Sequence, residues 1–290
     1  MLKQFATNHH MVLKKDQKLR ILFHLVINYF FLLKLYLYKK IKSINHPIVH
    51  YYGLCWNEEK MLPFMFDYYG QFVDKFTIFD NYSTDQSEKI INSHSNAKII
   101  KFSMNNQIND FVYQDIKNNC WKKSRGKADY VVVCDMDEFI YTPQMKLFLK
   151  DSLHHHISFF HPKGFEMYSK DYPNYEKGKL LTDLVKNGIT SSKYGKCILF
   201  DPHRIVEINY KPGAHECSPI GIVKESAEHQ LKMLHYKNLD EEIIVKKSLI
   251  NAARLSQDNI EAKYGEEYLW SESRIRDEFN RNLSQSTIVI

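Results

Sequence analysis

The sequence contains little glycine and little proline, which account for 10 and 8 of its 290 residues. Collagen-like repeats and long glycine- or proline-rich disordered tracts are therefore excluded. Hydrophobic residues make up 44% of the chain and charged residues 26%, as in ordinary folded domains. A globular chain of this length can bury a substantial core.

The chain also has only a small excess of positive charge and no cysteines in a recognisable pairing pattern. The 40 lysines and arginines outnumber the 34 acidic residues by only 6, which argues against a dedicated nucleic-acid-binding protein. This surplus suits an anionic small substrate or a membrane surface. The five cysteines are odd in number and form no Cys-x-x-Cys pair, so neither a disulfide framework nor a zinc site is indicated. We therefore expect reduced thiols and a cytoplasmic location.

The first 45 residues differ in character from the rest. Residues 21–38 read ILFHLVINYFFLLKLYLY, an apolar run that borders on the length of a membrane-spanning helix. Lys34 within the run disfavours a span, and the basic residues on both flanks suit anionic lipid headgroups. We predict that residues 1–45 form a separate segment with a hydrophobic helix, peripheral to the cytosolic face of a membrane. A helix that packs on the protein or in a homo-oligomer, and a true span, are the alternatives.

Residues 46–290 are predicted to form one α/β domain. Short apolar runs predict strands at 48–56, 75–79, 98–102 and 130–134, with helices between them at 58–69, 84–92 and 108–123. The run at 130–134 is apolar at every position, as in strands covered on both faces. This alternation predicts a mostly parallel, Rossmann-type sheet flanked by helices. Further along, we expect helices at 143–151, 240–264 and 272–280, a strand at 157–160, and loops with short strands over 161–220.

The strongest candidate for chemistry directly follows the strand predicted at 130–134. Asp135 and Asp137 leave the carboxyl edge of the predicted sheet, where open parallel sheets bind ligands. Two carboxylates at this spacing can offer oxygens to Mg²⁺ or Mn²⁺, and the cation in turn screens a diphosphate. A solvated loop or a helix cap would show the same spacing, but the position after a buried strand favours a binding site.

Two further polar clusters follow the first two predicted strands. The first consists of Asn57, Glu58 and Glu59. Its acids are also compatible with the start of a helix, where the dipole favours negative charge. The second consists of Asp80, Asn81, Ser83 and Asp85. Its side chains could contact a ribose or base, or form the side-chain bonds of a turn.

Together, the three clusters resemble the GT-A-fold glycosyltransferases of the family 2 type. The resemblance is closer to the branch with N-E-E, F-D-N-x-S-x-D and D-x-D-E-F motifs, which is related to family 92-type enzymes. The matching stretches are WNEE at 56–59, FDNYSTD at 79–85 and DMDEF at 135–139. Shorter landmarks of this branch match GKCI at 195–198, GAHE at 213–216 and LHYK at 234–237.

The resemblance implies metal-dependent transfer of a sugar from a nucleotide diphosphate sugar to a hydroxyl of a glycan or lipid-linked glycan. It implies inversion at the anomeric centre, in surface polysaccharide or glycoconjugate biosynthesis. The residues that it assigns to the donor are Asn57, Glu59, Asp80, Asn81, Ser83, Asp85 and Asp135. Those that it assigns to a Mn²⁺ or Mg²⁺ ion are Asp135, Asp137 and His235.

An inverting transfer also needs a general base for the acceptor hydroxyl. Glu216 and His215 are the leading candidates, with Asp171 and Glu166 behind them. The alternative for each is a solvated loop residue with no catalytic role. The rival function is a non-catalytic glycan- or protein-binding member of the same fold. A nucleotidyltransferase is disfavoured because no glycine-rich phosphate loop follows the first strand.

Overall fold

The computed structural model describes residues 19, 22, 23, 26, 30, 46–225 and 231–290. The chain divides into two compact units, Met1–Asn45 and His46–Ile290. The hydrophobic helix predicted at 21–38 falls almost entirely outside the described residues, so it stays a prediction. Within the described part of the chain, no helix is both long enough and apolar enough to cross a membrane.

A five-stranded sheet with the order β3-β2-β1-β4-β8 lies at the centre of the second unit. Its strands are β1 (Val49–Cys55), β2 (Lys75–Asp80), β3 (Ala97–Lys101), β4 (Tyr130–Asp135) and β8 (Leu199–Phe200). The first four are parallel to one another, and β8 runs antiparallel to β4. Every residue of β4 before Asp135 is buried, as expected for a strand covered on both faces. The predicted α/β class with a mostly parallel sheet is confirmed.

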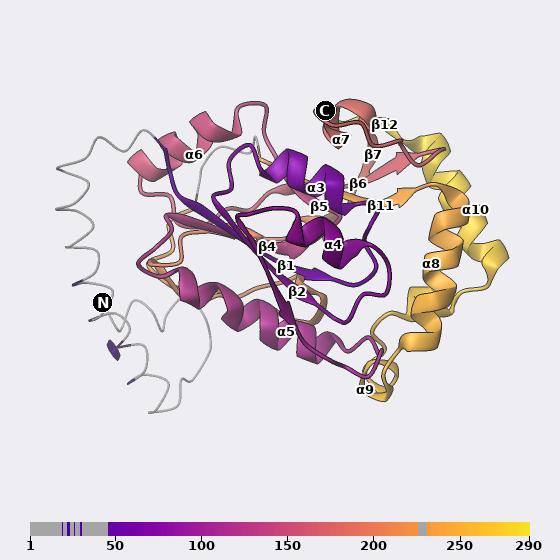
Figure 1. Ribbon diagram of the computed structural model, residues 1–290, viewed down its shortest axis with the longest axis horizontal. Coiled ribbons are helices and arrows are strands. Elements are labelled where there is room, and N and C mark those ends of the chain that lie inside the picture. The colour runs from indigo at the N-terminus through magenta and orange to yellow at the C-terminus, as the bar shows by residue number, and fades with distance from the viewer. Residues whose placement is uncertain (1–18, 20–21, 24–25, 27–29, 31–45, 226–230) are drawn as a thin grey trace. The chain divides into compact units, whose positions relative to one another are not determined.

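Three helices connect the parallel strands. They are α3 (Leu62–Tyr69), α4 (Ser87–Asn92) and α5 (Asp110–Asn119), the last continued by the 3-10 helix η1 (Cys120–Ser124). Figure 1 shows α3 and α4 on one side of the central strands and α5 on the other. Right-handed crossovers produce this arrangement when the chain reverses its direction across the sheet after β3. The reversal places the carboxyl ends of β1 and β4 next to each other, with Leu54 opposite Asp135.

A second five-stranded sheet has the order β12-β7-β6-β11-β5. Its strands are β5 (Glu138–Tyr141), β6 (Lys163–Ser169), β7 (Asn187–Thr190), β11 (Lys232–Leu239) and β12 (Thr287–Ile288). Strand β11 pairs parallel with β6 and antiparallel with β5. Because only two residues separate β4 from β5, the second sheet begins at the carboxyl edge of the first.

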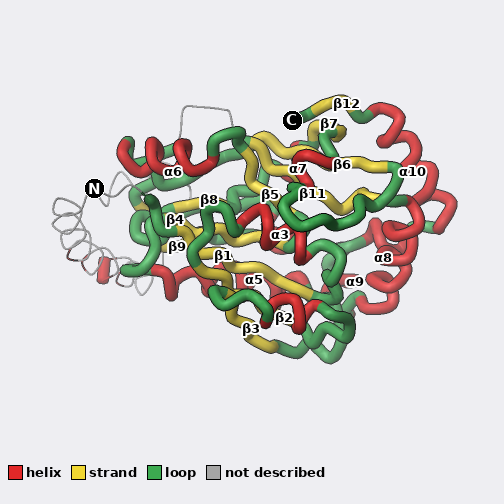
Figure 2. The backbone as a smooth tube through the Cα atoms, turned by 45° about the horizontal axis from the view of Figure 1, so that its top comes forward, coloured by secondary structure: helices red, strands yellow, loops and turns green. Residues whose placement is uncertain are grey.

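The remaining elements complete the unit around these sheets. The helices are α6 (Met145–His154), α7 (Leu181–Leu184), α8 (Glu241–Arg254), α9 (Gln257–Glu261) and α10 (Glu272–Gln285). The others are strands β9 (Ile205–Glu207) and β10 (Ile220–Gly221) and the 3-10 helices η2 (Ser192–Tyr194), η3 (Pro212–Ala214) and η4 (Glu266–Leu269). Figures 1 and 2 both show α8 and α10 side by side, and their apolar faces pack together around Tyr168 of β6.

Several predicted boundaries were wrong. No strand forms at 157–160, where Phe159 makes only isolated bridges. The long helix predicted at 240–264 ends at Arg254, because the chain there pairs with Ile108 through two backbone hydrogen bonds before α9 begins. The helix predicted at 84–92 begins later, at Ser87, and neither Ser83 nor Thr84 caps it. The helix predicted at 58–69 likewise begins at 62, so its two acids lie before the helix and not in its first turn.

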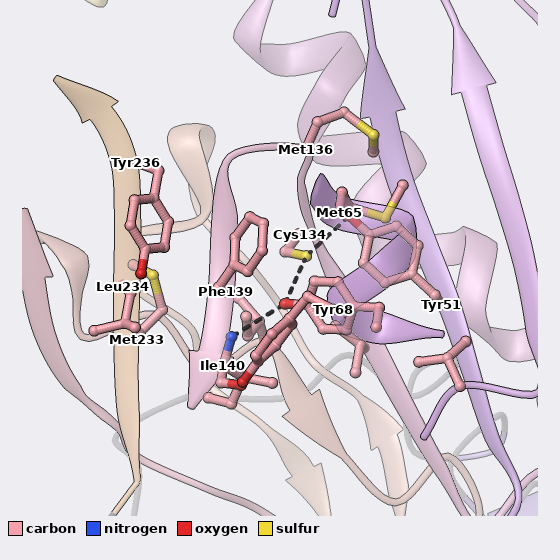
Figure 3. Close-up of a cluster of buried hydrophobic side chains, with 14 of the residues drawn as sticks. Tyr51, Met65, Tyr68, Cys134, Met136, Phe139, Ile140, Met233, Leu234 and Tyr236 are labelled. Carbon is pink, nitrogen blue, oxygen red and sulfur yellow. Dashed lines mark hydrogen bonds between the residues drawn. The ribbon is translucent and has the colours of Figure 1, made fainter. Parts of the chain in front are cut away.

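A buried cluster of aromatic and sulfur-containing side chains joins the two sheets (Figure 3). Phe139 of β5 packs against Tyr68 of α3 and edge-on against Tyr236 of β11, with ring centroids 5.0 and 5.1 Å apart. The hydroxyl of Tyr68 donates to the carbonyl of Ile140 and that of Tyr69 to the carbonyl of Glu138, both at 2.7 Å. Much of the aromatic content of the chain is therefore structural, and it holds β5 in place.

The segment that carries Tyr194 lies tightly against β6. A β-carbon added at Gly164 would lie 2.3 Å from the carbonyl carbon of Tyr194 and 2.4 Å from the nitrogen of Gly195. We expect Gly164→Ala to lower the free energy of unfolding by about 3 kcal/mol, because backbone atoms must move apart. Urea unfolding measures the loss.

The matched control is Gly178→Ala. Gly178 has a φ of +86° but no atom within 4 Å of an added β-carbon, so it reports the cost of the left-handed conformation alone, about 1 kcal/mol. Equal losses in the two variants would show that the close approach to β6 does not limit stability.

Candidate active site

The turn between β4 and β5 carries the two predicted metal ligands. Met136, at its first position, is 1% exposed and points into the aromatic cluster (Figure 3). Its Cε lies against β1, where a β-carbon added at Gly53 would be only 2.1 Å away. With Met136 anchored in the core, Asp135 and Asp137 on either side of it line a cavity.

This cavity has a volume of about 520 Å³, within the usual range for small-molecule sites. Its walls come from the end of β1, the start of α5, the β4–β5 turn, the loops that contain η2 and η3, β11, and α8 with the chain that follows it. Five predicted site residues line it: Asp135, Asp137, His215, Glu216 and His235. Three short landmarks that are far apart in the sequence thus meet the Asp-x-Asp motif.

Asp137 and His235 face each other across the junction of β5 and β11. Strand pairing places His235 opposite Glu138, and the amide of Tyr236 donates to the carbonyl of Asp137 at 2.8 Å. The imidazole Nε2 of His235 lies 3.6 Å from a carboxylate oxygen of Asp137. Burial alone would raise the pKa of Asp137, but His235 lowers it well below its usual range. Asp137 is therefore an anion at neutral pH.

Tyr194 of η2 holds the two histidines of the cavity. Its ring stacks on His235 with centroids 4.1 Å apart and meets His215 edge-on at 5.4 Å. The other ring nitrogen of His235, Nδ1, is buried and has no hydrogen-bond partner among the described residues. Ring packing, and not a second hydrogen bond, therefore fixes the orientation of this imidazole.

Glu138 organises the turn from beneath. One of its carboxylate oxygens accepts from the amide of Asp135 at 3.0 Å, and the other accepts from the ammonium of Lys196 at 2.5 Å. Both side chains of the Glu138–Lys196 pair are almost fully buried. Burial would raise the pKa of Glu138, but Lys196 and then Lys117 lower it to about 2. The backbone of the Asp-x-Asp turn is thus tied to a fixed buried charge.

Two further lysines neutralise carboxylates of the cavity. Lys117 of α5 donates to Asp135 at 2.8 Å, and Lys247 of α8 donates to Glu58 at 2.6 Å. Burial would lower the pKa of Lys117, but the carboxylate of Asp135 raises it, so the lysine stays charged. The pKa of Glu58 is raised by burial, with Lys247 opposing the rise.

The residues around the turn fit a metal ion only in part. The described part of the chain contains no group of three His, Cys, Asp or Glu side chains suited to hold a metal. Asp137 and His235 offer one carboxylate and one imidazole, whereas one oxygen of Asp135 already bonds Lys117. Mg²⁺ is commonly held by one or two protein ligands together with substrate phosphates and water. The site therefore fits a metal that a phosphate ligand completes, and not a stand-alone metal centre.

The two leading base candidates differ in setting. Glu216 is 69% exposed and forms an ion pair with Lys211 at 2.7 Å. His215 is partly buried, and its Nδ1 lies 2.8 Å from the carbonyl oxygen of Lys193. A carbonyl only accepts, so Nδ1 carries the proton and the lone pair is on Nε2. Burial and the charge of Lys196 lower the pKa of His215 to about 3, so the imidazole is neutral at pH 7.

Gly213 allows the imidazole of His215 to sit where it does. It has a φ of +74°, in the left-handed region that favours glycine. A β-carbon at this position would lie 2.7 Å from the Cδ2 atom of His215. Both the backbone conformation and the close approach therefore require glycine in the GAHE landmark.

The other candidate bases lie elsewhere. Asp171 is exposed and Glu166 accepts from Asn238 at 3.2 Å, and neither lines the cavity. The predicted donor-binding residues outside the cavity lining are Asn57, Glu59, Asp80, Asn81, Ser83 and Asp85. Their role in donor binding stays a prediction.

The first two motifs bind each other. The amide of Asn57 donates to the hydroxyl of Ser83 at 2.9 Å, and the amide of Glu59 donates to Asp85 at 3.0 Å. Asp80 is fully buried and accepts from the Ser83 hydroxyl at 2.5 Å and from Lys101 at 2.6 Å. We name these reciprocal bonds between the loops after β1 and β2 the loop interlock. It fixes the chain on both sides of Glu58, which does reach the cavity.

Several cavity residues escaped the sequence analysis as site residues. They are Glu58, Lys117, Tyr194, Lys196, Lys247 and Arg254. Glu58 lay within a recognised cluster, and Lys196 lay within the GKCI landmark. Lys247 lay within the helix predicted at 240–264, but helical periodicity does not show what a given face of the helix meets.

No known protein-family model matches the sequence, and no curated protein matches it. Among solved structures, S. aureus TarS is similar at 11% identity with a TM-score of 0.42, over 71% of this chain and 41% of TarS. TarS 1-349 in complex with UDP-GlcNAc gives 11% identity and a TM-score of 0.39, over 80% and 71% of the two chains. Glucosyl-3-phosphoglycerate synthase from Mycobacterium tuberculosis, in complex with phosphoglyceric acid, gives 18% identity and a TM-score of 0.27, over 41% and 44%. The chain thus spans about two fifths of the TarS chain.

The buried pair of Glu138 and Lys196 leads to a stability prediction. We expect Lys196→Met to lower the free energy of unfolding by about 3–5 kcal/mol at pH 7, because it leaves the Glu138 carboxylate buried and unpaired. The folded-state pKa of Glu138 is about 2, below the ordinary 4.5. The stabilisation is therefore present above pH 4.5 and lost as the pH falls towards 2, and Lys196→Met should weaken that dependence. Urea unfolding between pH 3 and 7 measures both effects.

Lys211→Met is the control, because it breaks an exposed, solvent-screened pair with Glu216 and should leave the free energy of unfolding nearly unchanged. A loss of similar size in both variants would contradict a structural role for the buried pair.

Proposed function

We propose that this protein transfers a sugar from a nucleoside diphosphate sugar to an acceptor hydroxyl. One observation carries the proposal: the turn at the carboxyl end of β4 brings Asp137 next to His235 in a polar cavity. Open α/β sheets bind nucleotides at this edge, where the strand order reverses. The resemblance of the three motifs to glycosyltransferases supports the same chemistry.

In this proposal the donor diphosphate lies at the Asp137–His235 end of the cavity. Asp137 and His235 would hold a Mn²⁺ or Mg²⁺ ion together with the diphosphate, and the ion would stabilise the charge that develops on the leaving group. Asp135 is fixed by Lys117 and keeps one oxygen available to accept from a ribose hydroxyl. Glu138 holds the turn by accepting from the amide of Asp135.

We assign the general base to His215 in preference to Glu216. The acceptor oxygen would attack the anomeric carbon, the bond to the diphosphate oxygen would break, and the acceptor proton would move to Nε2 of His215. The hydrogen bond to the carbonyl of Lys193 supports this role, since it leaves the Nε2 lone pair available. With a pKa of about 3 in the unliganded cavity the imidazole is a weak base, so the role requires that the negative charge of the bound diphosphate raises this pKa. Glu216 is the weaker candidate because it is solvated and already paired with Lys211.

The acceptor and the location are inferred from the sequence. A glycan or lipid-linked glycan acceptor follows from the family resemblance, as does inversion. Attachment to the cytosolic face of a membrane would rest on the apolar run at 21–38 and its basic flanks.

The transfer proposal predicts that Asp137→Asn abolishes turnover. We expect a loss of at least about 100-fold in product formation, because the variant removes the negative charge that would hold the metal ion against the diphosphate. The assay measures the nucleoside diphosphate released from each of a panel of nucleotide sugars, with Mn²⁺ or Mg²⁺ added. Asp277→Asn on α10, an exposed acid outside the cavity, should keep wild-type activity. Donor binding without turnover by the wild type, across acceptors, would favour the non-catalytic alternative.

The base assignment predicts that His215→Gln lowers the transfer rate by about 100-fold or more while donor binding is retained. A larger loss in Glu216→Gln than in His215→Gln would move the assignment to the glutamate.

The low pKa of His215 also predicts how the stability of the protein depends on pH. Its pKa is about 3 when folded and 6.5 ordinarily, so its protonation favours the unfolded chain as the pH falls from 6.5 towards 3. His215→Gln should remove that part of the acid destabilisation, which urea unfolding across this range would measure.

A further inference from the structure

Arg254, the last residue of α8, is a buried cation with an unused donor. It is 5% exposed and lines the cavity beside Trp56. Its Nε donates to the carbonyl of Asn106 at 2.9 Å, and its guanidinium carbon lies 3.1 Å from the centroid of the Trp56 ring. Its Nη2 is buried and has no hydrogen-bond partner among the described residues. The side chain is thus held in place with one buried donor nitrogen, Nη2, left over.

The charge of Arg254 is also left without a counter-ion. Burial lowers its pKa, and the groups that oppose this are Tyr113 and Tyr268, neither of which is a carboxylate. No Asp or Glu of the described chain forms an ion pair with it within 4 Å. Buried charges in proteins are normally paired, since an unpaired one costs several kcal/mol. The missing negative charge is therefore expected from a ligand.

Three of the lysines that line the cavity make the contrast clear. Lys117, Lys196 and Lys247 each bond a carboxylate, at 2.8, 2.5 and 2.6 Å. Those cations are already neutralised within the chain. Arg254 differs from them because the groups that meet it among the described residues are a carbonyl, an aromatic face and two phenols.

The face of α8 relates Arg254 to the diphosphate end of the cavity. Lys247, Asn251 and Arg254 are spaced i, i+4 and i+7, so they share one face of the helix, and all three line the cavity. Seven residues of helix span about 10 Å. Lys247 lies at the end of the cavity that contains Glu58. Burial would lower the pKa of Lys247, but the charges of Glu58 and then Asp137 raise it. Arg254 therefore marks a second, separate end of the same cavity.

We propose that Arg254 binds a second anionic group of the substrate, a phosphate or carboxylate, at the Trp56 end of the cavity. The Asn251 amide, one turn earlier on the same face, is placed to donate to the same group. This inference rests on the proposed function only in assigning the other end to the donor diphosphate. The anion belongs either to the acceptor or to the donor, and a competition experiment distinguishes the two.

The test measures the binding of inorganic phosphate by the full-length protein in buffer stripped of divalent metal. We expect phosphate to raise the Tm of the wild type in a concentration-dependent way, because it binds only the folded state. Calorimetry should give a Kd at least tenfold weaker for Arg254→Gln. Acetate in place of phosphate reports the carboxylate preference.

Arg274→Gln is the matched control. Arg274 also stacks on a tryptophan, with its guanidinium carbon 3.9 Å from the ring centroid of Trp270, but it lies on α10 outside the cavity. It should bind phosphate as the wild type does. Arg254→Lys keeps the charge without the planar fork, so it serves if Arg254→Gln fails to fold, and we expect it to bind at least threefold more weakly. A role of Arg254 in folding alone would lower the Tm of the unliganded variants and leave their phosphate affinity unchanged.

Unchanged phosphate affinity in both Arg254 variants would overturn the proposal, as would a wild type that binds neither phosphate nor acetate. Because the assay needs no donor, metal or turnover, its failure leaves the transfer proposal standing. If the protein binds phosphate through Arg254 but forms no product with any donor and acceptor, the transfer proposal is contradicted and the Arg254 site stands. Displacement of phosphate by added nucleoside diphosphate assigns the anion to the donor, and simultaneous binding assigns it to the acceptor.

Discussion

The two-residue turn between β4 and β5 is the constraint on which the site depends. It is held from three directions: Met136 is buried against β1, the Tyr69 hydroxyl bonds the backbone of β5, and Glu138 bonds the amide of Asp135. The fixed turn directs β5 away from the first sheet, and β5 pairs with β11 in the second. That sheet then carries His235 on β11 to within 3.6 Å of Asp137.

Charge is distributed in the cavity so that most of it is satisfied before any ligand binds. Lysines from α5, the GKCI segment and α8 each neutralise one carboxylate. Such fixed pairs cost desolvation energy, but they hold donors and acceptors in place without reorganisation during a reaction. Among the described residues that line the cavity, two buried polar atoms have no hydrogen-bond partner, the Nδ1 of His235 and the Nη2 of Arg254. In the proposals above, the donor diphosphate would lie beside the first of these atoms and the second anionic group beside the other.

The loop interlock shows that motif residues can serve to hold the backbone of two loops together. The side chains of Asn57, Ser83 and Asp85 accept from backbone amides of the opposite loop, and that of Asp85 also accepts from its own loop. Such side-chain bonds replace regular secondary structure where two loops meet. The interlock brings Glu58 to the cavity and sets the backbone from which Trp56 meets Arg254. Residues that share a motif therefore differ in what they contact.

The sequence by itself determined the parallel sheet and the place of the Asp-x-Asp motif. Apolar runs such as 130–134 are local signals, and the crossover rule converts their order into topology. The second sheet was missed because its pairing joins β5 to β11, almost one hundred residues apart by sequence number, and periodicity within a strand does not name its partner. The same holds for the pair of Lys247 with Glu58, 189 residues apart, and for the exposure that separates His215 from Glu216. Only the tertiary structure decided which charges are paired and which remain open, because pairing depends on distances across the cavity that local sequence does not encode.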